Sequence, residues 1–148
     1  MITLAILQVM TNDIADLELD ENAFWEELPL QSNGKPAQGV WLVTRGGSLT
    51  NTPNGFNQKA TIDIYVAYQN KAYAELLHGE ILEWIRNNSY ICDLSGNAGG
   101  SGIQYEFKNV RIRPTTTPQN YGATDNGNII KMASADIVYD AIHTNQIN

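Results

Sequence analysis

The chain has 148 residues, of which 43% are hydrophobic, and it carries a formal net charge of −7 at pH 7. This length suits one domain over residues 1–148, and this hydrophobic content is too high for a disordered chain. No apolar run approaches the ~20 residues that span a membrane, and no basic residue precedes the first apolar stretch, so we expect neither a membrane anchor nor a signal peptide. The single cysteine, Cys92, excludes an internal disulfide and a cysteine-rich metal cluster.

The chain opens with a helix pattern that is followed by an acidic segment. Apolar residues recur at spacings of three and four in MITLAILQVMTNDI, which predicts a helix of about three turns. No Lys or Arg precedes Lys35, and seven of the sixteen acids lie in residues 13–27. The other nine acids balance the nine bases, so the surplus of negative charge lies in this segment. It is either a solvated connection or a surface that repels nucleic acid or meets a basic partner.

Two strand patterns follow a weakly alternating stretch, AFWEELPL. QGVWLVTRGG predicts a short buried strand that stops at its two glycines, and QKATIDIYVAYQN predicts the clearest strand of the chain. In this second strand Lys59, Thr61, Asp63 and Tyr65 face away from the apolar side. The polar stretch between the two strands, GGSLTNTPNGF, is longer than a tight hairpin needs, so we expect a loop there.

The second half of the chain predicts another helix and three more strands. KAYAELLHGEILEWIRNN has an apolar stripe at helical spacing, with Leu76 and Leu82 lying off it. The predicted strands are SYICDL, FKNVRIRP and NIIKMASADIVYDAI, and in the second of them Arg111 and Arg113 share one face. Runs of strands interrupted by two helices indicate an α+β fold. We expect a mostly antiparallel sheet with two main helices packed on one face and long polar loops.

The glycine-rich stretch LSGNAGGSGIQY raises the possibility of a phosphate-binding loop. A Walker-type loop needs Lys and then Ser or Thr after its last glycine, at the start of a helix. Here Gly102 is followed by Ile103 and Gln104, and no lysine comes before Lys108. The dinucleotide pattern fails as well, because it requires glycine or alanine where Tyr105 stands. The stretch is therefore interpreted as a flexible connection.

Other candidates for chemistry are few. Neither His78 at the edge of the helical stripe nor His143 near the C-terminus has a histidine or acid four residues on, as a helical metal site would need. A lone cysteine in an apolar strand, such as Cys92, is usually core filler. We expect the carboxylates that face outward from strands simply to be solvated; these are Asp63, Asp136 and Asp140. No catalytic, cofactor-binding or metal-binding residue is predicted, and the chain is not expected to be an enzyme.

Surfaces stand out more than reactive groups. Three connections, at 46–58, 94–105 and 114–128, are long and rich in Gly, Asn and Thr. They are either merely mobile or become ordered against neighbouring molecules. Arg111 and Arg113 form either a solvated or internally paired strand face, or a surface that meets the acidic segment of a neighbouring copy. The full set of candidate interface residues is Arg111, Arg113, Leu76, Leu82, Asp16, Glu18, Asp20 and Glu21.

The order of elements resembles the tail terminator, or tail completion, proteins of long-tailed bacteriophages. The resemblance lies in the N-terminal helix, then GVWLVTRGGS, a polar stretch, and KATIDIYVAYQNKAYAELLHGEILEWI, in which a strand runs straight into a helix. It covers residues 1–140 and consists of architecture, without a catalytic signature. No invariant functional residue is carried over from the family.

The resemblance implies an α+β subunit of a closed ring, typically of six copies, at the head-proximal end of the tail tube. Such a ring stops tube polymerisation and presents a surface to the head connector, and DNA passes through it without specific binding. The subunit would be made in the host bacterial cytoplasm and would reside in the neck of the virion. Its partners would be itself, the tail tube protein and a head-completion protein. Alternatives are another neck or minor capsid protein, such as a head-closure adaptor, or a module that binds a small ligand or peptide.

Overall fold

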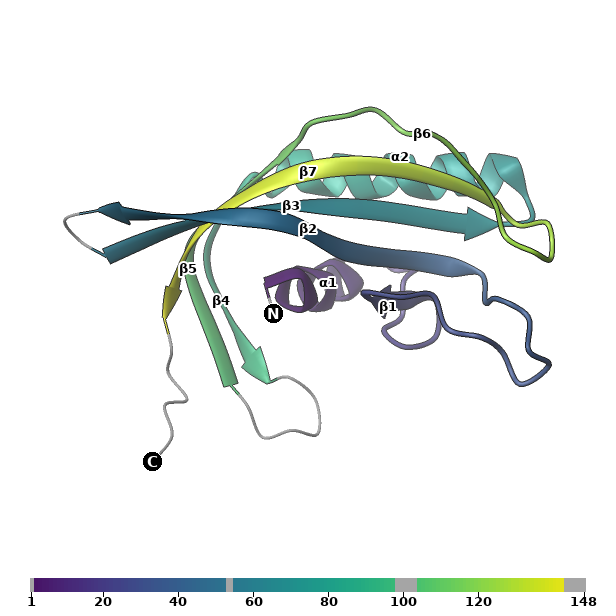
Figure 1. The fold of residues 1–148 in the computed structure, drawn as a ribbon, viewed down its shortest axis with the longest axis horizontal. Coiled ribbons are helices and arrows are strands. Elements are labelled where there is room, and N and C mark those ends of the chain that lie inside the picture. The colour runs from purple at the N-terminus through teal and green to yellow at the C-terminus, as the bar shows by residue number, and fades with distance from the viewer. Residues whose placement is uncertain (1, 53–54, 98–103, 143–148) are drawn as a thin grey trace.

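The computed structural model describes residues 2–52, 55–97 and 104–142. These residues form two helices and one seven-stranded sheet, with strand order β1-β2-β3-β7-β5-β4 and β6 beside β7 (Figure 1). In chain order the elements are α1 (Ile2–Asp13), β1 (Ala23–Trp25), β2 (Gly39–Thr52), β3 (Gly55–Tyr68), α2 (Lys71–Asn87), β4 (Tyr90–Asn97), β5 (Gln104–Pro114), β6 (Gln119–Ala123) and β7 (Ile129–Ile142).

The sheet is mixed, because its shortest strand runs parallel to its neighbour. β1 pairs with β2 in parallel, from Ala23 opposite Val40 to Trp25 opposite Leu42. The other pairs of described strands are antiparallel. The predicted α+β class is therefore confirmed, with a sheet that is mixed and not wholly antiparallel.

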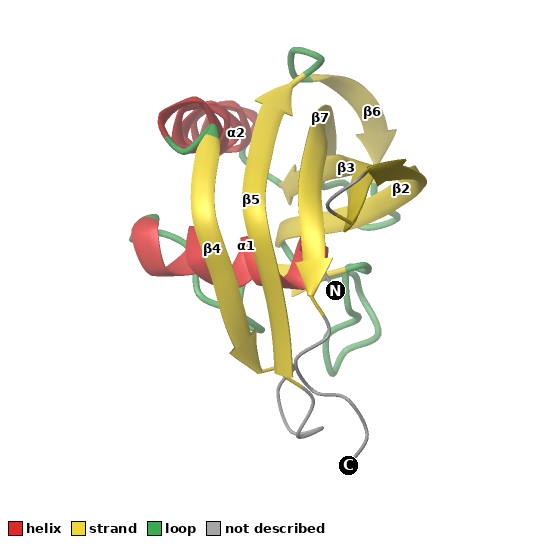
Figure 2. Cartoon of the chain, turned by 90° about the vertical axis from the view of Figure 1, so that its left-hand side faces the viewer, coloured by secondary structure: helices red, strands yellow, loops and turns green. Residues whose placement is uncertain are grey.

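The long strand β7 joins the two halves of the sheet. One edge of β7 pairs with β3, from Ile129 opposite Tyr68 to Asp140 opposite Asn57. Its other edge pairs with β6 near its start and with β5 near its end. β5 has a bulge at which Asn109 adopts a φ of 53°, and bulges bend and twist a strand. As a result β4 and β5 run steeply across the direction of β2 and β3 (Figure 2).

Both helices lie on the same side of this curled sheet (Figures 1 and 2), where the buried apolar side chains form one cluster. The alternation predicted for β3 is confirmed, because Ile62, Ile64 and Val66 are buried in this cluster. α1 is buried on more of its circumference than a stripe would require, and even Thr3 and Leu7 are inaccessible. The reason is its position inside the curl, where it contacts β1, β2 and β4.

The second predicted helix is confirmed as α2 and is capped at both ends. The side chain of Asn70 accepts a hydrogen bond from the backbone N–H of Tyr73, and the backbone N–H of Asn88 donates to carbonyl groups of the last turn. An N-cap of this kind stabilises a helix by about 1 kcal/mol. Neither helix in the described part of the chain combines the length and apolarity needed to cross a bilayer.

The prediction of long polar loops is wrong at two places. β2 continues past the glycine pair by means of a bulge at Gly46, which has a φ of 64°, and β2 and β3 stay paired out to Thr52 opposite Gly55. The stretch 114–128 contains β6, which pairs with β7. Polar side chains do not prevent strand pairing, because the backbone supplies the hydrogen bonds.

Parts of the sequence-based predictions fall on residues that are not described. The glycine-rich connection is shorter than the predicted range 94–105, because β4 reaches Asn97 and β5 begins at Gln104. Gly99, Gly100 and Gly102 lie outside the described residues, and so does His143.

Candidate functional site

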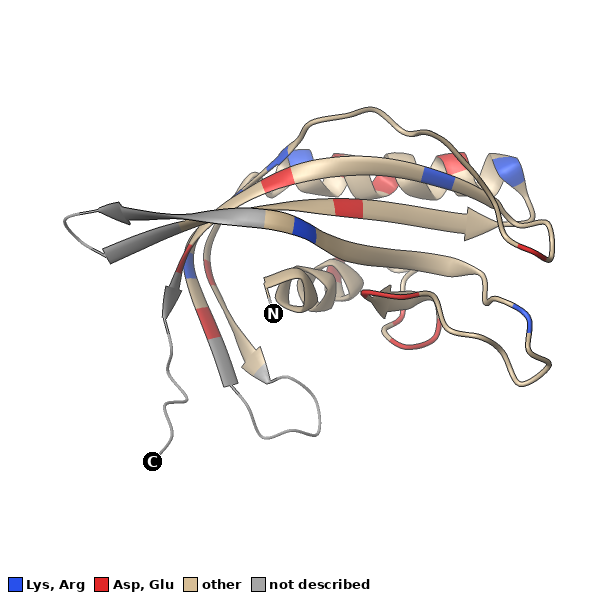
Figure 3. Ribbon diagram, in the orientation of Figure 1, with Lys and Arg blue, Asp and Glu red and all other residues tan. Residues whose placement is uncertain are grey.

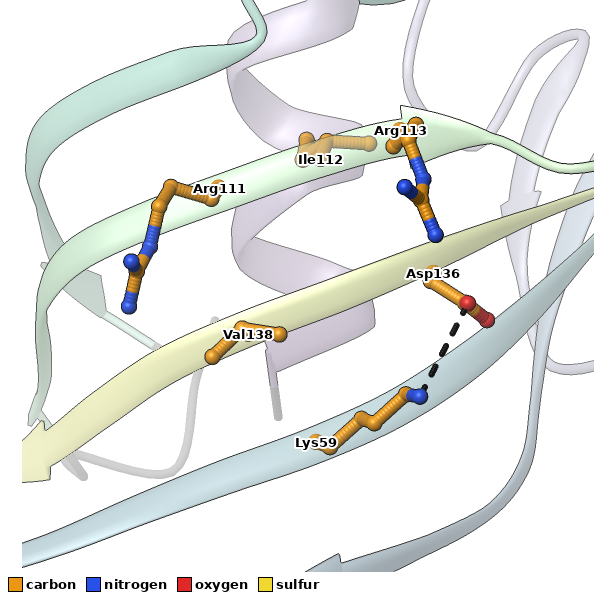
Figure 4. A pocket seen from close by; sticks show the side chains of 6 residues that line it. All are labelled: Lys59, Arg111, Ile112, Arg113, Asp136 and Val138. Atoms are coloured by element: carbon orange, nitrogen blue, oxygen red, sulfur yellow. Dashed lines mark ion pairs between the residues drawn. The ribbon is translucent and has the colours of Figure 1, made fainter.

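The face of the sheet opposite the helices, here called the outer face, carries a groove lined by three basic residues. Arg111 and Arg113 extend from β5 towards β7, and Lys59 extends from β3 on the other side of β7 (Figure 4). The groove has a volume of about 320 Å³. We call it the basic groove; it is lined by Lys59, Arg111, Ile112, Arg113, Asp136 and Val138. The structure thus brings together the two arginines that the sequence singled out, and adds Lys59.

Asp136 supplies the negative charge in the basic groove and is not simply solvated as predicted. Its carboxylate accepts a hydrogen bond from Thr61 Oγ1 at 3.1 Å and lies 3.9 Å from Lys59 Nζ. Three cations and one carboxylate leave the groove with two surplus positive charges. Within the described residues neither Arg111 nor Arg113 forms an ion pair or a side-chain hydrogen bond. The groove therefore presents two unneutralised guanidinium groups.

The acidic candidates also come together, in a compact turn after α1 that we call the acidic turn, residues 16–22. Two hydrogen bonds from the Asn22 side chain close the turn. Its Nδ2 donates to the carbonyl of Asp16, and its Oδ1 accepts from the N–H of Glu18, both at 2.7 Å. Asp20 adopts a φ of 67°, a conformation that Asp tolerates better than most residues. The side chains of Asp16, Glu18, Asp20 and Glu21 are exposed. No cation of the described residues forms an ion pair with them.

Other acids of the 13–27 segment have structural roles, so a merely solvated connection does not describe it. Asp13 accepts a hydrogen bond from the indole N–H of Trp84 at 2.8 Å, which ties the end of α1 to α2. Glu26 accepts a hydrogen bond from Thr44 Oγ1 at 3.1 Å on β2. These contacts fix the segment on the body of the molecule.

The two charged surfaces lie on different parts of the subunit. Acidic residues gather around β1 and the turn before it, whereas the strand that carries the arginine pair, β5, lies towards the other end of the long axis (Figure 3). A second hollow, about 380 Å³ in volume, opens at the acidic end between α1 and β1. Among its lining residues are Leu4, Trp25 and Glu27, so this end offers apolar surface beside its acids.

A buried carboxylate, paired with an exposed arginine on the outer face, corrects the prediction for Asp63. The Asp63 carboxylate accepts from Arg45 Nε at 2.9 Å and from Ser134 Oγ at 2.6 Å. Asp63 is only 5% exposed, although its position on the strand is outward as predicted. It is covered because the Arg45 side chain from β2 lies over it, and periodicity within one strand cannot reveal a neighbour from another strand.

An aromatic cluster on the outer face was not predicted. Trp41 of β2 stacks on Tyr65 of β3 with ring centroids 4.9 Å apart, and Tyr65 meets Tyr121 of β6 edge-on at 5.1 Å. Burial, followed by the hydrogen bond between the Tyr65 and Tyr121 hydroxyl groups, raises the pKa of Tyr65 to about 12. We call these three residues the aromatic row. The register between strands places the three rings side by side, and no spacing within the sequence indicates that they meet.

His78 is a buried residue of the core, not an edge residue of the helical stripe. Its ring is fully inaccessible, and neither ring nitrogen has a hydrogen-bond partner among the described residues. Burial, followed by the nearby charge of Lys131, lowers the pKa of His78 to about 4. The imidazole is therefore neutral at pH 7 and fills space.

Three further predictions are decided by burial. Leu82 is only 5% exposed, so it belongs to the core and cannot serve as an interface residue, whereas Leu76 is 62% exposed. The stripe of α2 is wider than predicted because the curled sheet covers more of the helix. Cys92 is exposed on the edge strand β4 and is not core filler.

No cluster of three or more potential metal-ligating residues occurs in the described ranges.

No protein-family model matches the chain, and no curated protein matches it. Function must therefore be inferred from the surfaces themselves.

Proposed function

We propose that this chain is a virion structural protein, the ring-forming tail terminator of a long-tailed bacteriophage. In this proposal copies of the chain form a ring, typically of six, that caps the tail tube and joins it to the head connector. The α+β architecture and the resemblance in element order support the proposal. It assigns the function to surfaces and to no reactive group.

The observation that carries the proposal is the composition of the outer face. Both helices cover the opposite face of the sheet, so this face displays the aromatic row and the basic groove. Trp, Tyr and Arg are the residue types most enriched at the energetic centres of protein interfaces. Tyr121 remains 58% exposed, which leaves a large amphipathic ring available to a partner. An outer face of this kind suits contact with other protein subunits.

The charge balance is consistent with a ring through which DNA passes. Each chain carries a net charge of −7 at pH 7, so every copy in a ring adds surplus negative charge. Like charge repels the phosphates of a duplex, so a channel wall with surplus acid would let DNA slide without sticking.

The proposal is tested with polymerising tail tube protein. We expect the added chain to bind one end of the tubes and to stop their growth, as measured by tube length in electron micrographs. Tubes that grow unchanged in excess of this protein would contradict the terminator assignment. Binding to a head-connector protein without binding to tubes would favour a head-closure adaptor instead.

A pair of alanine variants tests the role of the outer face. Tyr121→Ala should weaken binding to the tube, or between copies, by at least about tenfold, because truncating a hot-spot aromatic residue costs about 2 kcal/mol or more. Leu30→Ala is the control, because Leu30 is 68% exposed and lies in the segment between β1 and β2, outside the aromatic row and the basic groove. Equal affinities for both variants and the wild type would remove the aromatic row from the interface.

A further inference from the structure

We propose that the acidic turn of one copy docks into the basic groove of the next copy. This inference rests on the proposed function in one respect, namely that copies of the chain form a ring. It goes further by naming the two surfaces that meet and the residues that pair: Arg111 and Arg113 on one side, and Glu18 and Glu21 on the other.

The basic groove is suited to a carboxylate ligand. Arg111 and Arg113 project from the same face of β5, and Lys59 faces them across β7 (Figure 4). The only acid lining the groove, Asp136, is already engaged by Thr61 and Lys59. The planar fork of a guanidinium group matches a carboxylate with two parallel hydrogen bonds. Two free guanidinium groups side by side can therefore accommodate two carboxylates.

The acidic turn is suited to be that ligand. The two hydrogen bonds of the Asn22 side chain hold the backbone of the turn in one conformation, so docking costs little conformational entropy. Glu18 and Glu21 lie three residues apart on the turn, and the N–H of Glu21 donates to the carbonyl of Glu18 at 3.1 Å. Both side chains are exposed and have no cation beside them in the described part of the chain.

One chain cannot pair these two surfaces with each other. All sixteen acidic and nine basic side chains fall on described residues, and the ion pairs they form use neither the arginine pair nor the acidic turn. The surfaces lie on different parts of the subunit (Figure 3). Two unlike, complementary patches on one subunit produce a head-to-tail contact, and such contacts close into rings when the rotation between copies allows it.

Charge reversal tests the pairing. We expect the groove variant, Arg111→Glu with Arg113→Glu, to associate at least about tenfold more weakly than the wild type, because like charges then face each other. The turn variant, Glu18→Lys with Glu21→Lys, should lose association to the same degree. Asp20 is left unchanged because its positive φ disfavours lysine. Mass photometry or native mass spectrometry measures the assemblies.

Mixing the two variants gives the decisive result. The groove variant has acids at the pairing positions of both its groove and its turn. The turn variant has bases at the pairing positions of both surfaces, although Asp16 and Asp20 leave its turn with no net charge. Neither variant therefore pairs with itself. Each pairs with the other at both surfaces, so an equimolar mixture should form rings in which the two variants alternate. The mass of such rings shows equal numbers of both chains. A chain that carries all four substitutions should also regain ring formation by itself.

The control is a double reversal of two basic residues elsewhere, Lys71→Glu with Arg86→Glu, both exposed on α2. It changes the net charge as much as the groove variant does and should leave the ring intact. Circular dichroism confirms that each variant is folded.

Three results would overturn the inference. One is a groove variant that still forms wild-type rings; the ring would then exist without this pairing, and the proposed function would survive. Another is the absence of mixed rings when both single variants fail. The third is binding of a fluorescent DNA duplex by the wild type that the groove variant loses while its rings persist, which would assign the basic groove to nucleic acid. A wild type that forms no ring, even with tube protein, contradicts the proposed function itself.

Discussion

His78 is the residue whose protonation links the fold to pH. Burial lowers its folded pKa from 6.5 to about 4, so between these values the unfolded chain binds more protons than the folded one. The free energy of unfolding therefore falls as the pH falls from 6.5 to 4, by about 3 kcal/mol from this residue when the shift is fully expressed.

Urea unfolding at pH 7 and at pH 4.5 measures this contribution. We expect His78→Phe to lose less stability between the two pH values than the wild type, since phenylalanine fills a similar volume and cannot be protonated. Other groups that titrate in this range are common to both proteins and cancel in the comparison. Identical pH dependence in the two proteins would show that His78 is not buried as described.

A substitution at Asp63 tests its polar contacts on the outer face. Asp63→Asn removes a charge that Arg45 and Ser134 satisfy, and we expect a loss of about 2 kcal/mol in unfolding free energy. Asp125→Asn, at an exposed position, should change stability by less than about 0.5 kcal/mol. Urea denaturation of both variants separates the effect of the Asp63 contacts from a general effect of charge. Equal stabilities would contradict the contact.

At the scale of elements, Gly39 controls how the segment before β1 docks on β2. A Cβ atom at Gly39 would lie 2.6 Å from the carbonyl oxygen of Asn22 and 2.9 Å from Phe24 Cε2. The same carbonyl accepts the backbone hydrogen bond from Val40 at 2.8 Å. Any side chain at position 39 therefore displaces Asn22, whose side chain closes the acidic turn.

Two glycine substitutions test this packing, because we expect them to change the free energy of unfolding in opposite directions. Gly39→Ala should lower the unfolding free energy by about 1–3 kcal/mol, as overpacking does. Gly79→Ala, in the open middle of α2 with no atom within 4 Å of the new methyl group, should raise it by about 0.5–1 kcal/mol. Thermal unfolding compares the two variants. A stable Gly39→Ala variant would show that β1 is not seated closely on β2.

The elements that the sequence predicts well are those with a hydrophobic period of their own. α2 has a helical stripe and an asparagine at each end, and β3 alternates cleanly, so both are predicted correctly. The outer half of the β2–β3 hairpin and β6 have no such period, because their residues are polar and their partners are set by backbone pairing. α1 is predicted as a helix, but its burial on several sides depends on the curl of the sheet.

The same distinction applies to the candidate site. Alternation within β5 places both arginines on one face, and proximity in sequence brings Glu18 and Glu21 together, so both sets can be predicted. Lys59 and the aromatic row join the outer face through the register between strands, which one strand does not encode. The burial of Leu82 and Asp63 depends likewise on side chains that come from distant parts of the chain.

At the scale of the whole molecule, the predicted ring contact should respond to salt. The proposed pairing joins exposed charges, and the distance over which such charges interact falls from about 10 Å at 0.1 M to about 3 Å at 1 M ionic strength. We expect association between copies to weaken by about tenfold or more over this range, with light scattering after size-exclusion chromatography as the measurement. A ring mass unchanged at 1 M salt would show that apolar contacts alone hold the copies together.

The central claim is that this chain works through association with copies of itself. The direct measurement is its mass in solution by sedimentation, over a range of concentrations, with and without tail tube protein. The claim predicts a closed assembly whose mass is a multiple of the 16.4 kDa subunit, formed by the chain alone or on the tube. A 16.4 kDa monomer at every concentration, unchanged by tube protein, would contradict it.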